Sequence, residues 1–518
     1  MFKAFANCWK IPELRQRLIV ALGLLFVARM GACIPLPGIN PTELERALSA
    51  AMSKADAGAG LMAMYNLFTG GALIKGAIFA LGIMPYISAS IIMQLMGAVV
   101  PSISRLQQEG DIGRQKIAQY SRYLTILIAV VQGFMLAAAL SNPDAVGQVL
   151  GNADAKNIEL VVINKSLFIL LAVVILTAGA VIMTWLGEQI TQRGIGNGTS
   201  ILITVGILAD LPGATKQFLT AFTPKVAGQT QLYTWEHGVG IIIMGVLVYA
   251  AMTAVAQTIR KIPVQYAKRL VGRKMYGGQS SYLPLKINFA GVMPVIFASA
   301  ILSFPSMMFQ WLGALLSTKE GVWRDIGGYC LKFANDFGAS STLYYIVEAV
   351  LIFAFSYFWV SLMFKPIQIA DDLKKNSGYI PGVRPGDATA KFLDFVMTRL
   401  TLAGSVFLVI IALLPNILAQ QFTFPSRLAY LMGGTGGLIA VGVSLDTMAQ
   451  IEAILLQRHY EGFLKKGRIG GLNIPMPSRK VVDFGEKRGL GRLGYVCVLI
   501  LVLGIAAAIY NFARVSAS

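Results

Sequence analysis

Residues 61–96 read LMAMYNLFTGGALIKGAIFALGIMPYISASIIMQLM, and the rest of the chain is organised around this stretch. Its first part, up to Gly71, is apolar but too short to cross a bilayer, which needs about 20 apolar residues. A longer apolar run follows at once and is interrupted by Gly82 and Pro85. The pattern predicts a short helical piece leading into a kinked membrane span. Such irregular backbone is tolerated at membrane depth only inside protein or beside a watery cavity.

Part of this stretch occurs a second time in the chain. GIMPYISASII at 82–92 matches GVMPVIFASAI at 291–301 at seven of eleven positions, and both contain Gly-x-Met-Pro. GTSILITVGILAD at 198–210 matches GTGGLIAVGVSLD at 434–446 at seven of thirteen positions. Apolar segments share letters by chance, but two matches in the same order indicate an internal duplication. The sequence therefore predicts two related halves.

The composition is that of a protein with many membrane spans. Of 518 residues, 56% are hydrophobic and 13% are charged, against about 25% charged in ordinary soluble domains. The polar and basic residues 1–17, followed by an apolar run that lacks a small-x-small cleavage site, predict that the N-terminus is not a cleaved signal. The four cysteines are scattered, so we expect neither a metal site nor a disulfide framework.

Eleven apolar runs are candidate membrane helices, at 18–34, 76–97, 120–140, 167–186, 199–212, 238–257, 287–312, 343–364, 397–415, 430–450 and 493–512. Lys and Arg total 31 in the N-terminal segment and even-numbered loops, counted with the adjoining helix ends, and 12 in the odd-numbered loops and C-terminal tail. This bias places the N-terminus in the cytosol. The second span then runs inward and the seventh outward. The two Gly-x-Met-Pro segments are therefore expected to lie antiparallel, as in inverted repeats.

Two cytosolic loops are long and basic. RKIPVQYAKRLVGRKMYGGQSSYLPLKIN at 260–288 holds seven Lys or Arg and no acid, and the loop 365–399 contains KKNSGYIPGVRPGD. Such loops often only enforce topology or contact anionic lipid. Their length and turn residues favour a second interpretation, a docking surface for a large acidic or RNA-containing partner.

Catalysis is poorly supported by the sequence. There are two histidines, far apart, and no HExxH, GxSxG or Walker-type GK[ST] motif. Ionisable residues within or at the ends of the spans are few, namely Arg29, Glu188, Glu348, Asp446 and Glu452. An ion-coupled transporter would place more of these near the midplane. We therefore expect that any work is driven by a partner or a gradient.

Long motifs in the chain resemble the SecY family, the channel subunits of the bacterial Sec protein translocase. They include IPLPGI near 34–39, NLFTGGAL, IFALGIMPYISASIIMQL, QYSRY, WLGEQITQRGIGNG, LPLKINFAGVMPVIFAS, ADDLKKNSGYIPGVRPG and VMTRLTL, and the match extends over about residues 10–465. The resemblance implies an all-α polytopic membrane protein, a ten-helix clamshell of two inverted five-helix halves. The halves are expected at 1–235 and 236–465, followed by an extension, 466–518, with a basic linker and an eleventh span.

The resemblance also implies a function and a set of site residues. Unfolded preproteins would pass through a central pore, and apolar segments would leave sideways between spans 2 and 7. The pore ring maps onto Ile83, Ile87, Thr199, Ile203, Ile296 and Ile439, and the plug onto Leu61, Met64, Tyr65, Asn66, Leu67, Phe68, Thr69, Gly70 and Gly71. The lateral gate maps onto Met84, Ser88, Ile91, Gln132, Asn288, Val292 and Ala300, and partner docking onto Arg273, Lys274 and Arg384. Thr199 departs from the family, which usually has an aliphatic residue there.

The expected partners are the SecE and SecG subunits, the SecA motor ATPase, the ribosome, preprotein substrates and membrane lipids. No cofactor, metal or sequence-specific nucleic acid binding is expected, and the location implied is the inner (plasma) membrane of a bacterial cell. Two other interpretations stay open at this point. One is an inverted-repeat secondary transporter of small solutes, and the other is a non-conducting assembly subunit.

Overall fold

The computed structural model describes residues 11–53, 65–66, 68–141, 161–222, 235–266, 269–271, 274–276, 280–317, 322–336, 342–421 and 434–466. The chain divides into two compact units. The first contains Met1–Thr234, Met307–Ser340 and Ile439–Val496, and the second contains Trp235–Ser306, Ser341–Leu438 and Cys497–Ser518. Each unit is described by itself below.

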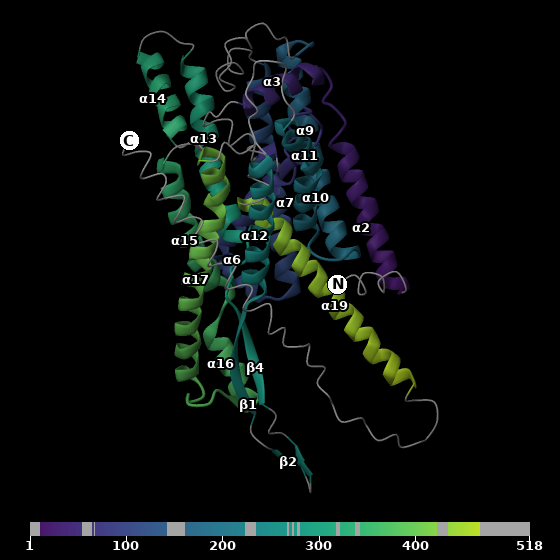
Figure 1. Ribbon diagram of the computed structural model, residues 1–518, viewed down its shortest axis with the longest axis vertical. Helices are drawn as coiled ribbons and strands as arrows, with labels where there is room; N and C mark the ends of the chain where they lie inside the picture. The colour runs from purple at the N-terminus through teal and green to yellow at the C-terminus, as the bar shows by residue number, and fades with distance from the viewer. Residues whose placement is uncertain are drawn as a thin grey trace. The chain divides into compact units, whose positions relative to one another are not determined.

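The first unit is built around two long antiparallel neighbours, α7 and α9 (Figure 1). Helix α5 packs on α7, while α2 and α10 pack on α9. The helices are α2 (Pro12–Gly31), α3 (Pro41–Ser53), α5 (Met84–Val99), α6 (Pro101–Gln108), α7 (Asp111–Ser141), α9 (Lys165–Arg193), α10 (Gly198–Ala209), α11 (Leu211–Phe222) and α14 (Val322–Asp336). The unit also takes in the end of α13 and α19 from Ile439 onward.

Helix starts in this unit follow local sequence signals. Pro12, Pro41 and Pro101 each stand at a first helical position, where the missing N–H costs nothing and the fixed φ suits a helix. Asn197 caps α10, because its Oδ1 accepts a hydrogen bond from Thr199 N at 3.2 Å.

In the helices of the first unit, small residues are among those that face inward, and several large apolar residues face outward. In α2, Ala21 and Ala28 are buried, whereas Phe26 is 66% exposed. In α9, Gly179 is buried and Trp185 is 53% exposed. Lipid is as apolar as leucine, so membrane helices gain from close backbone approach through small residues and leave large apolar side chains to the lipid.

The second unit combines long apolar helices with a short sheet. The helices are α12 (Trp235–Gln257), α13 (Met293–Ser317, up to Ser306 in this unit), α15 (Thr342–Met363), α16 (Pro366–Lys375), α17 (Asp387–Gln421) and the start of α19 (Gly434–Lys466). Helix α17 packs against both α15 and α16. Phe297 of α13 contacts Phe355 and Trp359 of α15 edge to face, with ring centroids 6.0 and 5.2 Å apart.

The expectation of a purely helical fold needs one addition, because the basic loop 260–288 forms a β-ribbon. Strand β1 (Ile259–Tyr266) pairs antiparallel with β4 (Ser280–Lys286) and with the short β5 (Gly378–Tyr379). Strands β2 (Arg269–Val271) and β3 (Lys274–Tyr276) pair with each other farther along the ribbon (Figure 1). The alternation of Ile262 and Val264, both buried, with exposed neighbours is the period-2 pattern of a strand. The basic residues had masked this pattern.

Six helices are long and apolar enough to cross a membrane among the described residues, at Ile112–Ser141, Lys165–Arg193, Gly198–Lys216, Leu343–Lys375, Asp387–Leu414 and Gly434–Leu455. Each of the first ten expected spans overlaps a helix. The full count of ten membrane spans stays a prediction, and the eleventh run, 493–512, lies outside the described residues.

The second expected span differs from its predicted form. Residues 70–83 form a series of turns, and α5 begins only at Met84, so the helix has 16 residues rather than the 22 of the apolar run. The turns are held by residues 34–36: Ile78 N donates to Ile34 O at 2.9 Å, and Leu36 N donates to Gly76 O at 2.8 Å. Gly82 and Pro85 therefore mark where the helix starts, not a kink in its middle.

The two copies of the Gly-x-Met-Pro motif have the same local geometry. Gly82 and Gly291 have φ values of +57° and +67°, a region that favours glycine. In each copy the helix starts two residues later, at Met84 and Met293, with Pro immediately after. The duplicated letters thus encode a duplicated helix start.

Candidate functional site

The described part of the expected plug, residues 65–66 and 68–71, is called the plug segment below and is organised by a buried asparagine. Asn66 is 1% exposed, and its Oδ1 accepts a hydrogen bond from Ile74 N at 3.3 Å. Its backbone carbonyl accepts from Thr69 Oγ1 at 3.1 Å and from Gly71 N at 3.0 Å. Asn66 thereby closes the turn through which the plug segment continues into the apolar turns at residues 70–83. The expected plug residues Leu61, Met64 and Leu67 lie outside the described residues.

Tyr65 anchors the start of the plug segment. Its hydroxyl donates to the carbonyl oxygen of Leu81 at 3.4 Å. Its ring packs on the unit's core cluster, which includes Phe168 and Leu176.

The plug segment lies against α10 through two glycines. A Cβ added to Gly70 would come within 2.7 Å of Gly206 Cα, and one added to Gly206 would come within 3.3 Å of Phe68 O. Gly70 also has a φ of +65°, which favours glycine. Gly82 also lies close to the plug segment, because a Cβ added to it would lie 3.2 Å from Thr69 Cγ2. A side chain at Gly70 would clash with the α10 backbone, and one at Gly206 would press tightly against the carbonyl oxygen of Phe68.

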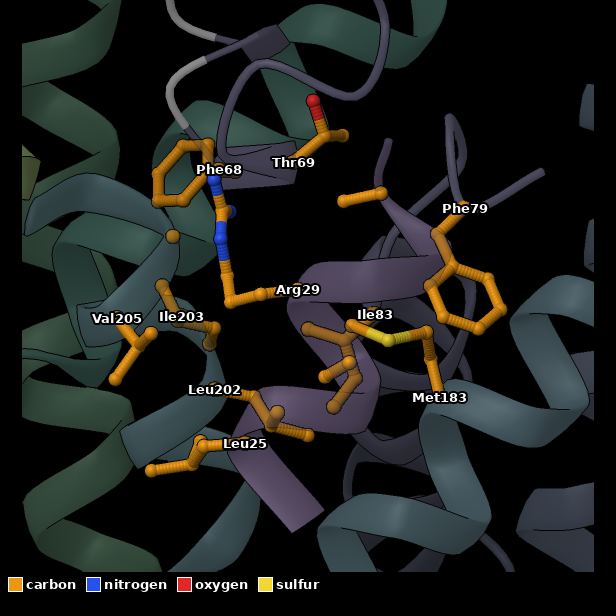
Figure 2. A pocket seen from close by; sticks show the side chains of 13 residues that line it. Leu25, Arg29, Phe68, Thr69, Phe79, Ile83, Met183, Leu202, Ile203 and Val205 are labelled. Carbon is orange, nitrogen blue, oxygen red and sulfur yellow. The ribbon is translucent and has the colours of Figure 1, made fainter. Parts of the chain in front are cut away.

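A small cavity separates the plug segment from two expected pore-ring residues. Ile83 and Ile203 line it, and so does Arg29 of α2 (Figure 2). The remaining lining residues are Leu25, Ala28, Ala32, Phe68, Thr69, Phe79, Met183, Leu202, Val205 and Gly206. The cavity offers about 20 Å³ to the centres of water molecules, room for about one water. Arg29 extends along the cavity towards the plug segment, and its guanidinium donates to Gly70 O at 3.1 Å.

Two of the pore-ring residues of the first unit meet at one point on α9. A Cβ added to Gly187 would lie 3.1 Å from Thr199 Cγ2 and 3.5 Å from Ile83 Cδ1. Thr199 Oγ1 donates to Asn197 Oδ1 at 2.7 Å, so its hydroxyl serves the cap of α10 and its methyl points to Gly187. Because the hydroxyl is taken up by the helix cap and the methyl group makes the apolar contact, a threonine fits at a position where the family usually has an aliphatic residue.

The other pore-ring residues are placed as follows. Ile203 in α10 is buried, and Ile87 in α5 is half-buried. Ile296 near the start of α13 belongs to the second unit, and Ile439 of α19 belongs to the first, with exposed fractions of 8% and 2%. A ring formed by all six stays a prediction.

The expected gate residues also divide between the units. Met84, Ser88 and Ile91 lie on α5, and Gln132 lies on α7, which packs against α5. Gln132 Oε1 is buried without a hydrogen-bond partner.

In the second unit, Asn288 and Val292 precede α13, and Ala300 lies within it. A Cβ on Gly404 of α17 would lie 3.5 Å from Asn288 Cα, so the Asn288 backbone packs on α17. Whether these residues and the four on α5 and α7 form one gate stays a prediction.

The two basic loops, expected to dock partners, are joined by backbone hydrogen bonds. Gln265 and Tyr266 of β1 pair with Tyr379 and Gly378, and Tyr379 Oη donates to Gln265 Oε1 at 3.0 Å. Arg384 is exposed in the second loop. Lys274 lies in β3, and Arg273 lies outside the described residues. The ribbon and the second loop therefore form a single element within the second unit.

Sequence reasoning missed the roles of Asn66, Gly206 and Arg29 as contacts of the plug segment. Arg29 carried a signal, because a charge inside an apolar run marks a functional residue by default. Asn66 and Gly206 carried none, because their partners are set by the fold. Among the described residues, no group of three or more His, Cys, Asp or Glu could hold a metal ion.

Comparison with known proteins gives a consistent result. Residues 77–448 match the SecY family model. The chain is 41% identical over 473 residues to the protein translocase subunit SecY of Mycobacterium bovis, a match that covers 90% of this chain and all of the relative. Two solved structures share the fold. One is a protein-conducting channel, with a TM-score of 0.55 at 19% identity, covering 85% of this chain and 92% of that one. The other is a SecY protein whose plug domain stabilises the closed translocation channel, with a TM-score of 0.53 at 18% identity, covering 88% and 95%.

Proposed function

The chain belongs to the SecY family, and on that premise we propose that it is the protein-conducting channel subunit of a Sec translocon. It passes unfolded preproteins across the membrane and releases apolar segments sideways into lipid. The observation that carries this function is the plug segment seated on α10 through Gly70 and Gly206, one small cavity away from Ile83 and Ile203. Such an arrangement supports a plug that closes a pore beside these two isoleucines.

The pore ring suits this task through its side-chain chemistry. Isoleucines are stiff because of their branched Cβ, so a ring of them forms a close collar that excludes water and ions. Such a collar has no hydrogen-bonding groups of its own and favours no particular substrate sequence. We assign Ile83, Ile87, Ile203, Ile296 and Ile439 to this collar, together with the methyl group of Thr199.

Sideways release follows from differences in solvation. A Leu or Ile gains about 0.3 to 0.6 kcal/mol in the membrane, whereas Asp, Lys or Arg at mid-helix costs about 2.5 to 3.5 kcal/mol. A stretch of about 20 apolar residues therefore partitions into lipid, and a charged stretch continues through the pore. We propose that the exit lies between α5 and α13, whose matching helix starts support equivalent roles in two inverted halves. The gate residues would be Met84, Ser88, Ile91, Gln132, Asn288, Val292 and Ala300.

Partners and location follow from the same premise. We propose that SecE and SecG assemble with the chain and that SecA or the ribosome docks on the basic ribbon and its neighbouring loop, through Arg273, Lys274 and Arg384. The distribution of Lys and Arg supports a cytosolic N-terminus and cytosolic docking loops. A location in a bacterial inner membrane fits these partners. The transporter alternative is not favoured, because the family and the solved structures that share the fold are protein channels.

Reconstitution tests this function. Vesicles containing the chain with SecE and SecG, supplied with SecA and ATP, should protect a preprotein from external protease, and vesicles without the chain should not. Replacing Ile203 by Asn should increase the ion leak of resting vesicles, because a polar group in the collar holds water. Leu208→Asn is the matched control, since Leu208 is 47% exposed on the same helix. Failure of the complete vesicles to protect any preprotein would contradict the proposed function.

A further inference from the structure

Arg29 is a charged residue at membrane depth that the proposed function does not use. It lies in the last turn of α2, within the first apolar run of the chain. A charge inside an apolar run is unfavourable unless it is paired or faces water. The described residues that line the cavity around Arg29 include no acid that could pair with it. The cost of this charge calls for a specific partner.

The partner is the plug segment. The Arg29 guanidinium donates to the carbonyl oxygen of Gly70, 41 residues away, at 3.1 Å. In Figure 2 the side chain extends along the cavity and ends beside Phe68 and below Thr69, both of which belong to the plug segment. A positive charge in the last turn of a helix also complements the helix dipole. That general effect does not explain why the side chain bonds to another segment.

The glycine at the receiving end fixes the geometry of this contact. A Cβ on Gly70 would lie 2.4 Å from Arg29 Nη1 and 2.7 Å from Gly206 Cα. The Gly70 carbonyl therefore meets Arg29 at the same place where the plug segment touches α10. Hydrogen bonds from charged donors are the strong ones, and a cavity with room for about one water offers little competition.

We propose that Arg29 is a latch: a positioning residue that holds the plug seated through its bond to the Gly70 carbonyl and loses that bond when the plug moves. The inference rests on the proposed function in one respect, because it assumes that the plug segment leaves its seat. It adds a specific residue, on α2, that sets how readily this happens. A substrate opening the channel must break this bond, after which the guanidinium faces the water that enters with the open pore.

The test measures plug position directly, without using export. In a chain whose native cysteines are replaced by serine, Thr69→Cys introduces a probe at a position that is 7% exposed when the plug segment is seated. A membrane-impermeant maleimide added to the side predicted to be external labels it only after unseating. Arg29→Met removes the donor and should raise the labelling rate by about tenfold or more. Arg29→Lys keeps the charge but has a shorter side chain, so its labelling rate should lie between those of the parent and of Arg29→Met.

Two controls make the outcome decisive. Lys165→Met removes a positive charge at the start of α9, on the side predicted to be external, and should leave labelling unchanged. Gly70→Ala unseats the plug segment by steric clash, so adding Arg29→Met to it should give no further increase. Gly71→Ala is the matched control for Gly70→Ala, because Gly71 also has a positive φ but has space for a Cβ.

Labelling of Arg29→Met at the parental rate, or an equal rise with Lys165→Met, would overturn the latch. Both results require variants that elute as folded protein. Export assayed in the same vesicles keeps the two proposals apart. Faster labelling in vesicles that never export a preprotein would support the latch and contradict the proposed function.

Discussion

Replacing Asn66 by Leu should unseat the plug segment with little change in side-chain volume. Asn66 is 1% exposed, and its Oδ1 is the acceptor for the N–H of Ile74, a residue that is itself 8% exposed. Leucine removes the acceptor and leaves this buried N–H without a partner, which costs about 1 to 3 kcal/mol. The equilibrium between seated and unseated plug should then shift by about 5-fold to 140-fold.

This shift can be measured as ion leak. Vesicles holding Asn66→Leu should lose an imposed pH gradient faster than parental vesicles, by a factor within that range, until most molecules are open. Asn40→Leu is the control, since Asn40 Oδ1 accepts from Thr42 Oγ1 at 2.8 Å in an exposed position. The Asn40 variant should leak at the parental rate. A folded Asn66→Leu protein that leaks no faster than the parent would refute the role given to Asn66.

Three further changes test other parts of the structure. Arg122→Gln breaks a bidentate pair with Glu188, whose bonds are 2.9 and 2.6 Å long, and should lower the free energy of unfolding by at most about 1 kcal/mol, because Arg122 is half exposed. The double variant with Glu188→Gln should recover this stability, and a loss of stability that does not change with added salt would count against an ion pair. Ile451→Ala leaves a cavity in the cluster of Leu14, Ile195 and Ile451 and should lower the free energy of unfolding by about 2 to 5 kcal/mol. A melting temperature equal to that of the parent would show that this cluster does not stabilise the packing of α19. Ile262→Asp places a charge at a position of β1 that is 3% exposed, which should disrupt the ribbon and abolish co-sedimentation with ribosomes. Ribosome binding that is retained in this variant would show that the ribbon is not the docking element.

Sequence reasoning placed the starts of the second and seventh spans too early, at residues 76 and 287, and interpreted Gly82 and Pro85 as a kink, whereas α5 begins at Met84 and α13 at Met293. Gly82 with Pro85, and Gly291 with Pro294, dictate a positive φ followed by a first helical turn, and no distant contact is needed. The length of the apolar run was misleading, because hydropathy does not distinguish turns packed inside protein from helix. Residues 70–83 are apolar and form turns, since their backbone finds partners in residues 34–36.

The site was predictable only in part. The resemblance assigned the plug and ring residues, and that assignment stays a prediction. The contacts of Arg29, Asn66 and Gly206 join residues 41, 8 and about 136 positions apart in the chain, and no local pattern encodes them. The β-ribbon was missed for a different reason. The seven basic residues of the loop 260–288 conceal an alternation in which Ile262, Val264 and Leu285 are buried among the loop residues whose side chains the structure describes.

The central claim is that α5 and α13 line a seam that must part for the channel to work. Cysteines at Ser88 and Ala300, in a chain without its native cysteines, test it most directly. Oxidation should join the two helices and stop both preprotein export and the release of apolar segments into lipid, and reduction should restore both. If the pair fails to form a disulfide, or if the cross-linked channel exports and inserts at the parental rate, the proposed gate is wrong.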